Sequence, residues 1–166
     1  PIPPEDVIDE FRRKEILLAY KKSIVSCNKK RNETNKELPI SYAKTPLKQL
    51  QLTGLKTDDI RKYFNDDSLE KLDADMFLRF AADKTMQLEK ANKAFQLMDE
   101  AQKGVVVIED LQRVCIELGE DLTEEELVEM IEFADSTGEG LLSPEHFFRI
   151  AHKVNPVSYT HLTLPT

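Results

Sequence analysis

Residues 99–110 read DEAQKGVVVIED, and residues 135–146 read DSTGEGLLSPEH. Each stretch begins with aspartate and has glycine at its sixth position, and the two aspartates lie 36 residues apart (135 − 99). Each stretch also interrupts a series of apolar residues at helical spacing. We therefore interpret them as the two loops of an internal repeat, helix–loop–helix twice.

The four segments that flank these loops carry the signals of helices. The second segment stops at Gly119, a residue common at helix C-termini. Thr123 with Glu126 three residues later predicts a capping box, and Ser143 followed by Pro144 predicts the start of the fourth helix. The apolar residues at helical spacing are Ala91, Ala94, Phe95, Met98, Leu111, Val114, Cys115, Leu118, Leu127, Met130, Ile131, Ala134, Phe147, Ile150 and Ala151.

The first 84 residues repeat this pattern more weakly. We expect a helix over residues 6–25, an inserted basic loop over 28–37, short helices that begin at Thr45 and Thr57, and a helix capped by Asp73. No proline or glycine interrupts residues 74–98. This last helix therefore either continues as a helical linker or breaks near Lys84 and Thr85. The prediction is an all-α fold of two lobes, residues 1–84 and 85–156.

The spacing within residues 99–110 can be compared with the needs of calcium. A twelve-residue calcium loop supplies oxygens from positions 1, 3, 5, 7, 9 and 12 and has glycine at position 6. Asp99 and Gly104 fit, but Ala101 at position 3 has no side-chain oxygen and Lys103 at position 5 is a cation. Asp110 at position 12 is one methylene shorter than the usual glutamate. We expect no calcium binding here.

Residues 135–146 offer a fuller set of ligands. The candidates at positions 1, 3, 5, 7 and 9 are Asp135, Thr137, Glu139, the carbonyl of Leu141, and Ser143. Position 12 is His146, which offers one nitrogen in place of two oxygens and suits softer metals. We expect calcium affinity below the sensor range of roughly 10⁻⁷ to 10⁻⁵ M.

Two stretches of the N-terminal half could also be loops. The stretch after Tyr20 is too long and too basic for a calcium loop. Residues 65–73 are too few for twelve ligand positions, and their acidic side chains are better explained as a solvated surface. Neither stretch is expected to bind calcium.

Charge is unevenly distributed between the two halves. Residues 1–84 hold 17 Lys and Arg against 15 Asp and Glu, a net of +2, whereas residues 85–166 hold 6 against 16, a net of −10. The acidic half would repel nucleic-acid phosphates. It favours a basic partner, such as an amphipathic helix rich in lysine and arginine.

Several function classes find no support in the residues. There is no glycine-rich phosphate loop, nucleophile motif or metal-binding histidine pair, so an enzyme is not predicted. No apolar run reaches the roughly 20 residues of a membrane helix. Cys27 and Cys115 lie far apart in sequence, which favours free thiols in a reducing compartment.

Both ends of the chain carry unusual features. It begins at Pro1 without methionine, so the lack of a targeting signal leads to no conclusion. Residues 157–166, VSYTHLTLPT, resemble a translated sequencing adapter. We exclude these ten residues from the interpretation of fold and function.

The C-terminal half resembles a known family. The segments AFQLMDEAQKG, LQRVCIELGEDLTEEELVEMIEFADSTGEG and HFFRIAHK, within residues 88–153, are similar to centrins (caltractins) and, more distantly, to calmodulin. The resemblance implies paired EF-hands, with a degenerate EF-hand-like lobe over residues 1–84. The departures from the family pattern at Ala101, Lys103, Thr137 and His146 argue for weak or lost calcium binding.

The resemblance also implies a function in binding other proteins. Such a lobe holds a target helix in an apolar groove, in the cytoplasm, with the centrosome, basal body or another cytoskeletal structure as candidate locations. Two alternatives remain open: a calcium sensor or buffer that uses the loop from Asp135 to His146, and a light-chain-like subunit of a motor or axonemal complex. The residues that match groove positions are Phe95, Met98, Leu111, Val114, Leu118, Leu127, Met130, Phe147 and Ile150.

Overall fold

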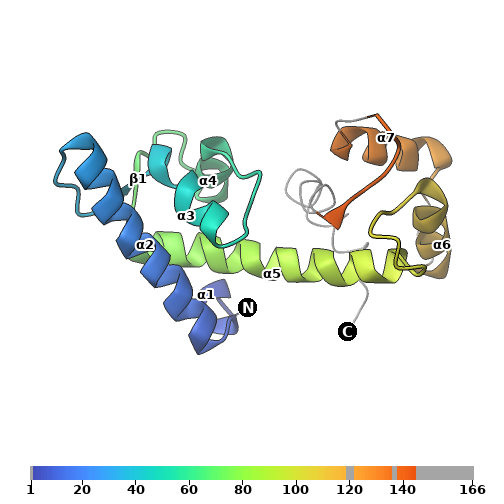
Figure 1. The fold of residues 1–166 in the computed structure, drawn as a ribbon, viewed down its shortest axis with the longest axis horizontal. Helices are drawn as coiled ribbons and strands as arrows, with labels where there is room; N and C mark the ends of the chain where they lie inside the picture. The colour runs from blue at the N-terminus through green and yellow to red at the C-terminus, as the bar shows by residue number, and fades with distance from the viewer. Residues whose placement is uncertain (1, 119–121, 136–137, 145–166) are drawn as a thin grey trace. The chain divides into compact units, whose positions relative to one another are not determined.

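The computed structural model describes residues 2–118, 122–135 and 138–144 (Figure 1). The predicted fourth helix after its first residue, Pro144, and the tail at 157–166 lie outside the described residues. The chain divides into two compact units, Pro1–Met86 and Gln87–Thr166, and each is described by itself. The helices are α1 (Pro4–Val7), α2 (Glu10–Arg31), the 3-10 helix η1 (Ile40–Tyr42), α3 (Lys44–Gln49), α4 (Thr57–Tyr63), α5 (Ala74–Met98), α6 (Ile108–Leu118) and α7 (Glu124–Ala134), and the strands are β1 (Leu38–Pro39) and β2 (Lys71–Leu72). The all-α prediction is confirmed.

Helix α2 is longer than the sequence suggested. The Asp9 carboxylate caps its start by accepting a hydrogen bond from the Arg12 N–H at 2.7 Å. Its last residue is Arg31, because Asn32 adopts a left-handed backbone (φ 53°) and the basic residues of the final turn suit the negative end of the helix dipole. The predicted end near residue 25 is therefore wrong, as is the inserted loop over 28–37, whose first four residues are helical.

A short antiparallel pair of strands joins the two loops of the first unit. Leu38 of β1 lies opposite Leu72 of β2. Both side chains are fully buried. The Tyr20 hydroxyl of α2 donates a buried hydrogen bond of 2.7 Å to the carbonyl oxygen of Leu72. This bond ties α2 to the strand β2, which precedes α5.

The core of the first unit lies between α2 and the first half of α5, with the short helices α3 and α4 completing it. Phe77 and Phe80 of α5 are completely buried. The Phe77 ring lies 5.5 Å from that of Tyr20, and the Phe80 ring meets Tyr63 edge-on at 5.2 Å. Aromatic pairs at these distances add to the stabilisation that burial provides.

Helix α5 begins where the sequence predicted it. The Asp73 carboxylate caps its first turn by accepting a hydrogen bond from the Met76 N–H at 2.8 Å. The helix is continuous from Ala74 to Met98, so there is no break near Lys84 and Thr85. Its residues up to Met86 belong to the first unit and those from Gln87 onward to the second.

The second unit contains the last part of α5 together with α6 and α7. Thr123 caps α7, and its hydroxyl accepts a hydrogen bond from the Glu126 N–H at 3.1 Å, which is one of the two hydrogen bonds of the predicted capping box. Leu111 of α6 and Ile131 of α7 are buried. The two helices pack against each other. The buried apolar side chains of this unit are Ala91, Ala94, Phe95, Met98, Val106, Leu111, Leu127, Ile131 and Leu142.

Two nearby residues of α2 test which of its faces holds the first unit together. Ile16 is completely buried and Leu18 is 51% exposed. We expect Ile16→Ala to lower the free energy of unfolding by about 2–5 kcal/mol, because the substitution leaves a cavity. Leu18→Ala is expected to change it by less than about 0.5 kcal/mol. Urea unfolding followed by far-ultraviolet circular dichroism measures both, and equal effects would contradict the assignment of the core face.

Candidate functional site

The two loops of the second unit are joined by a single backbone bridge. The Val106 N–H donates to the carbonyl of Leu142 at 2.7 Å, and the Leu142 N–H donates to the carbonyl of Val106 at 2.8 Å. Counted from Asp99 and Asp135, each bridging residue is at position 8 of its loop. The paired arrangement predicted from the internal repeat is therefore present in the described residues.

The Asp99 carboxylate shapes the first of these loops. Asp99 is only 6% exposed. One of its oxygens accepts a hydrogen bond from the Lys103 N–H at 2.9 Å, and the other accepts one from the Gly104 N–H at 2.6 Å. Gly104 has a φ of 82°, which favours glycine over other residues. The loop thus folds back onto its first side chain.

A lysine side chain joins the middle of the same loop to its last residue. The Lys103 ammonium nitrogen lies 3.2 Å from Oδ2 of Asp110, so positions 5 and 12 form an ion pair. The same Asp110 oxygen accepts a hydrogen bond from the Val107 N–H at 3.0 Å. The protein's own cation therefore joins two positions that would both supply oxygen ligands in a calcium loop. This residue set does not fit calcium.

A second basic side chain, Arg113, joins the two helices on either side of this loop, α5 and α6. The Arg113 guanidinium of α6 donates to the backbone carbonyls of Leu97 and Met98, at 3.2 Å and 2.9 Å. These are carbonyls of the last turn of α5, which lack intrahelical partners. Arg113 also lies 3.5 Å from the Glu100 carboxylate. The end of α5 and the middle of α6 are thus joined by side-chain contacts.

The second loop uses its first aspartate in the same way. Asp135 is 5% exposed, and its Oδ2 accepts hydrogen bonds from the N–H groups of Gly140 at 2.8 Å and Leu141 at 3.3 Å. Glu139 is exposed and Ser143 is half-buried.

The predicted calcium ligands of this loop are therefore only partly placed. Thr137 lies outside the described residues, as does His146. Among the residues that the structure describes, no group of three or more His, Cys, Asp or Glu side chains could hold a metal ion. The loop offers calcium one buried carboxylate, that of Asp135, and one exposed carboxylate, that of Glu139.

Two further loops of the same kind occur in the first unit, and the sequence interpretation missed their register. If the bridging residues Leu38 and Leu72 are placed at position 8, the loops are residues 31–42 and 65–76. The stretch after Tyr20 is then not too long, because α2 extends to Arg31. Residues 65–73 are not too few, because the last loop positions are the first residues of α5. Position 12 is Tyr42 in one loop and Met76 in the other, and neither side chain is a carboxylate.

A sequence signal for these loops existed in the spacing of apolar residues. Leu38, Leu72 and Val106 follow each other at intervals of 34 residues (72 − 38 and 106 − 72). Leu142 follows 36 residues later (142 − 106). The fourfold repeat is therefore visible once the bridge position is known.

Most described members of the predicted partner groove are core residues in this structure. Phe95, Met98, Leu111 and Leu127 are each at most 6% exposed, and Met130 is half-buried. Val114 and Leu118 belong to α6, but their side chains lie outside the described residues, as do Phe147 and Ile150. A groove built from the buried residues would need the helices to separate.

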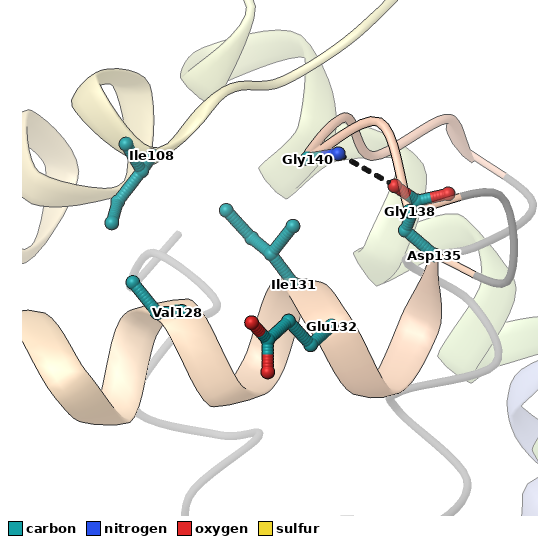
Figure 2. Close-up of a pocket in the computed structure, with 7 residues that line it drawn as sticks. All are labelled: Ile108, Val128, Ile131, Glu132, Asp135, Gly138 and Gly140. Atoms are coloured by element: carbon teal, nitrogen blue, oxygen red, sulfur yellow. Dashed lines mark hydrogen bonds between the residues drawn. The ribbon is translucent and has the colours of Figure 1, made fainter.

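A pocket of ≈ 470 Å³ opens beside α7 in the second unit. Figure 2 shows Ile108, Val128 and Ile131 facing a common space, with the hydrogen bond from Gly140 to Asp135 at one side. Glu132 lies on the α7 wall, and Gly138 completes the lining. The pocket thus combines an apolar surface with carboxylates at its edge, an arrangement suited to an apolar side chain that has a basic neighbour.

None of the described helices combines the length and the apolar character needed to cross a bilayer.

Comparison with known proteins yields relatives of one kind, although no protein-family model matches the chain. Caltractin of Naegleria gruberi is 38% identical over 105 residues, which cover 60% of this chain and 61% of that protein. Centrin-3 of Mus musculus is 30% identical over 125 residues, which cover 71% of this chain and 75% of that protein. A probable calcium-binding protein of Oryza sativa, CML8, is 36% identical over 85 residues, which cover 49% and 44% of the two chains.

The extent of these matches differs between relatives. The chain spans about half the length of the caltractin and the rice protein, at 61% and 44%. Among solved structures, a chain of the "Chaetomium theromophilum TREX2 CID domain complex" matches over 90% of this chain and 94% of that chain. Its sequence identity of 17% and TM-score of 0.41 are too low to support an argument.

The hydrogen bonds of Asp99 lead to a prediction about the second unit. Asp99→Ala removes the acceptor of two loop N–H groups, and we expect the free energy of unfolding to fall by about 1–3 kcal/mol. The neighbouring Glu100 has an exposed side chain, so Glu100→Ala should change stability by less than about 0.5 kcal/mol. Thermal unfolding in the presence of EGTA measures both variants. An unchanged Asp99→Ala variant would contradict the closing role of this carboxylate.

Proposed function

The chain belongs to the centrin/calmodulin-like EF-hand family, and on this premise we propose that its second unit binds an amphipathic helix of a partner protein, with weak or lost calcium binding. The main support is the ion pair between Lys103 and Asp110, at 3.2 Å. In a calcium-dependent loop, the metal joins positions 5 and 12 and so links the loop to the following helix. Here the Lys103 side chain makes that link without a metal.

Two further features support a hand that keeps its shape without metal. The carboxylates of Asp99 and Asp135 are already used by backbone N–H groups of their own loops. Arg113 neutralises the carbonyl end of α5 by its bonds to Leu97 and Met98. Because these contacts are built into the chain, binding of a partner would not depend on the cellular calcium concentration.

The chemistry of the partner follows from the surface around the pocket. The pocket wall is apolar at Ile108, Val128 and Ile131, and the exposed face of α7 is rich in glutamate. A helix with an apolar stripe and flanking lysine or arginine residues would complement both. We propose such a helix as the target. The exposed glutamates of α7 are Glu124, Glu125, Glu126, Glu129 and Glu132.

The family also guides the proposed location and the alternative functions. We place the protein in the cytoplasm, on a centrosomal, basal-body or other cytoskeletal partner. A light-chain-like subunit that stiffens a long helix would use the same surface and the same chemistry. A calcium sensor would instead need the loop from Asp135 to bind calcium. Titration with calcium distinguishes this alternative from the proposal.

Calcium titration tests whether the loops are disabled. By isothermal calorimetry we expect the parent chain to show no binding in the range of roughly 10⁻⁷ to 10⁻⁵ M, because position 12 of the second loop is histidine. His146→Glu should restore binding within that range, since glutamate supplies two oxygens. The control is His152→Glu, which adds the same charge outside the loop. Micromolar binding by the parent would make the protein a calcium sensor.

Peptide binding tests the proposed partner surface. The probe is a fluorescent helical peptide of about 20 residues with leucine on one face and lysine on both flanks. We expect binding of equal affinity in calcium and in EGTA. Val128→Asp, at the pocket, should weaken it about tenfold or more, whereas Ile116→Asp, a change at an exposed apolar residue of α6 outside the pocket lining, should not. Binding that requires calcium, or that both variants leave intact, would overturn the proposal.

A further inference from the structure

Helix α2 has apolar side chains on its outer face as well as on its core face. Phe11, Leu18 and Val25 are 76%, 51% and 68% exposed. They lie seven residues apart, which places them above one another in a single row along the helix. The opposite side of α2 packs into the core, where Ile16 and Tyr20 are buried. The outer row therefore lies away from the core of the first unit.

This outer row has the dimensions of a helix-binding seam. From Phe11 to Val25 it extends over 14 residues, or about 21 Å at 1.5 Å per residue. Single exposed apolar residues are ordinary, but three in one row supply one of the two apolar positions per heptad that a helix–helix seam uses.

Lysines lie on both sides of the row. Four exposed lysines lie three or four residues after its members, and residues at these separations are neighbours on a helix surface, one on each side. Glu15 is the acidic residue among them. The partner that matches these lysines would carry carboxylates. The four lysines are Lys14, Lys21, Lys22 and Lys29.

We propose that the outer seam of α2, Phe11–Leu18–Val25 with these lysines, binds an acidic amphipathic helix of another protein. The same face of a second copy would bring lysine against lysine and is disfavoured. A membrane surface would be met by a broad apolar face, whereas this strip is narrow and the other side of α2 is buried. The first unit would thus select a partner opposite in charge to the basic helix proposed for the second unit.

The test uses the 166-residue chain and two fluorescent helical peptides of about 21 residues, both with leucine in the seam positions. One carries glutamate on its flanks and the other lysine. We expect the acidic peptide to bind, with an affinity that falls between about 50 and 500 mM NaCl as the charges are screened. Leu18→Glu should weaken it about tenfold or more and leave the basic peptide unaffected.

Two further variants distinguish this proposal from the function proposed for the second unit. Val128→Asp should leave acidic-peptide binding unchanged. The double variant Lys21→Glu with Lys22→Glu keeps the apolar row and reverses the charge on both sides of Leu18, so it should weaken binding of the acidic peptide as strongly as Leu18→Glu does. Circular dichroism of each variant verifies that the helical content is retained, which the exposure of these side chains leads us to expect.

Three outcomes would overturn the proposal. The first is acidic-peptide binding that survives both α2 variants. The second is a concentration-dependent dimer in analytical ultracentrifugation that Leu18→Glu abolishes, because a second copy would then cover the seam. The third is sedimentation with phosphatidylserine-containing vesicles, lost in the same variant, without any binding of the acidic peptide.

Discussion

The backbone pairing of two loops is the constraint on which both units depend. Leu38 lies opposite Leu72, and Val106 exchanges two backbone hydrogen bonds with Leu142. All four side chains are completely buried. Because each bridge fixes two loops at once, it also sets where the helices on either side begin and end. One helix–loop–helix motif is unstable alone, and the pairing joins two of them into a compact unit.

In the second unit, side chains of the chain itself make contacts at positions that supply calcium ligands in an EF-hand loop. A cation that binds six to eight oxygens can organise a loop of carboxylates. In the first loop of the second unit, Lys103 joins Asp110, Asp99 holds the loop N–H groups, and Arg113 binds the end of α5. The ammonium and guanidinium groups are covalently part of the chain, so these contacts need no metal ion. They are the physical basis on which we propose a hand that forms without calcium.

The unequal charge of the two halves gives the units different surfaces. The first 84 residues carry a net charge of +2, and the remainder −10. The lysines of α2 and the glutamates of α7 both lie on exposed faces that also carry apolar side chains. Charge of opposite sign beside similar apolar strips favours different partners, since complementary charge determines encounter and specificity more than total affinity. A protein with two such surfaces could join an acidic helix to a basic one.

Local signals in the sequence were enough to predict much of this protein. The helical periodicity, the caps at Asp73 and Thr123, and the glycines at loop position 6 depend on neighbouring residues only, and the structure contains them. The resemblance to centrins is confirmed by the relatives of the chain. The sequence also shows that Lys103 stands at position 5 of its loop, where a calcium ligand is needed, because ligand positions are counted along the chain.

Only the tertiary structure decided the contacts between residues that are far apart in the sequence. The register of the loops in the first unit depends on Leu38 meeting Leu72, which no local pattern specifies. The end of α2 at Arg31 and the row of Phe11, Leu18 and Val25 on its outer face became clear once the core side was known. By itself, the sequence determined the helix–loop–helix repeat of the second unit and which residues stand at its loop positions, since these follow from spacing. The fold determined which apolar residues are buried and which remain available to a partner, because burial depends on the packing of the whole unit.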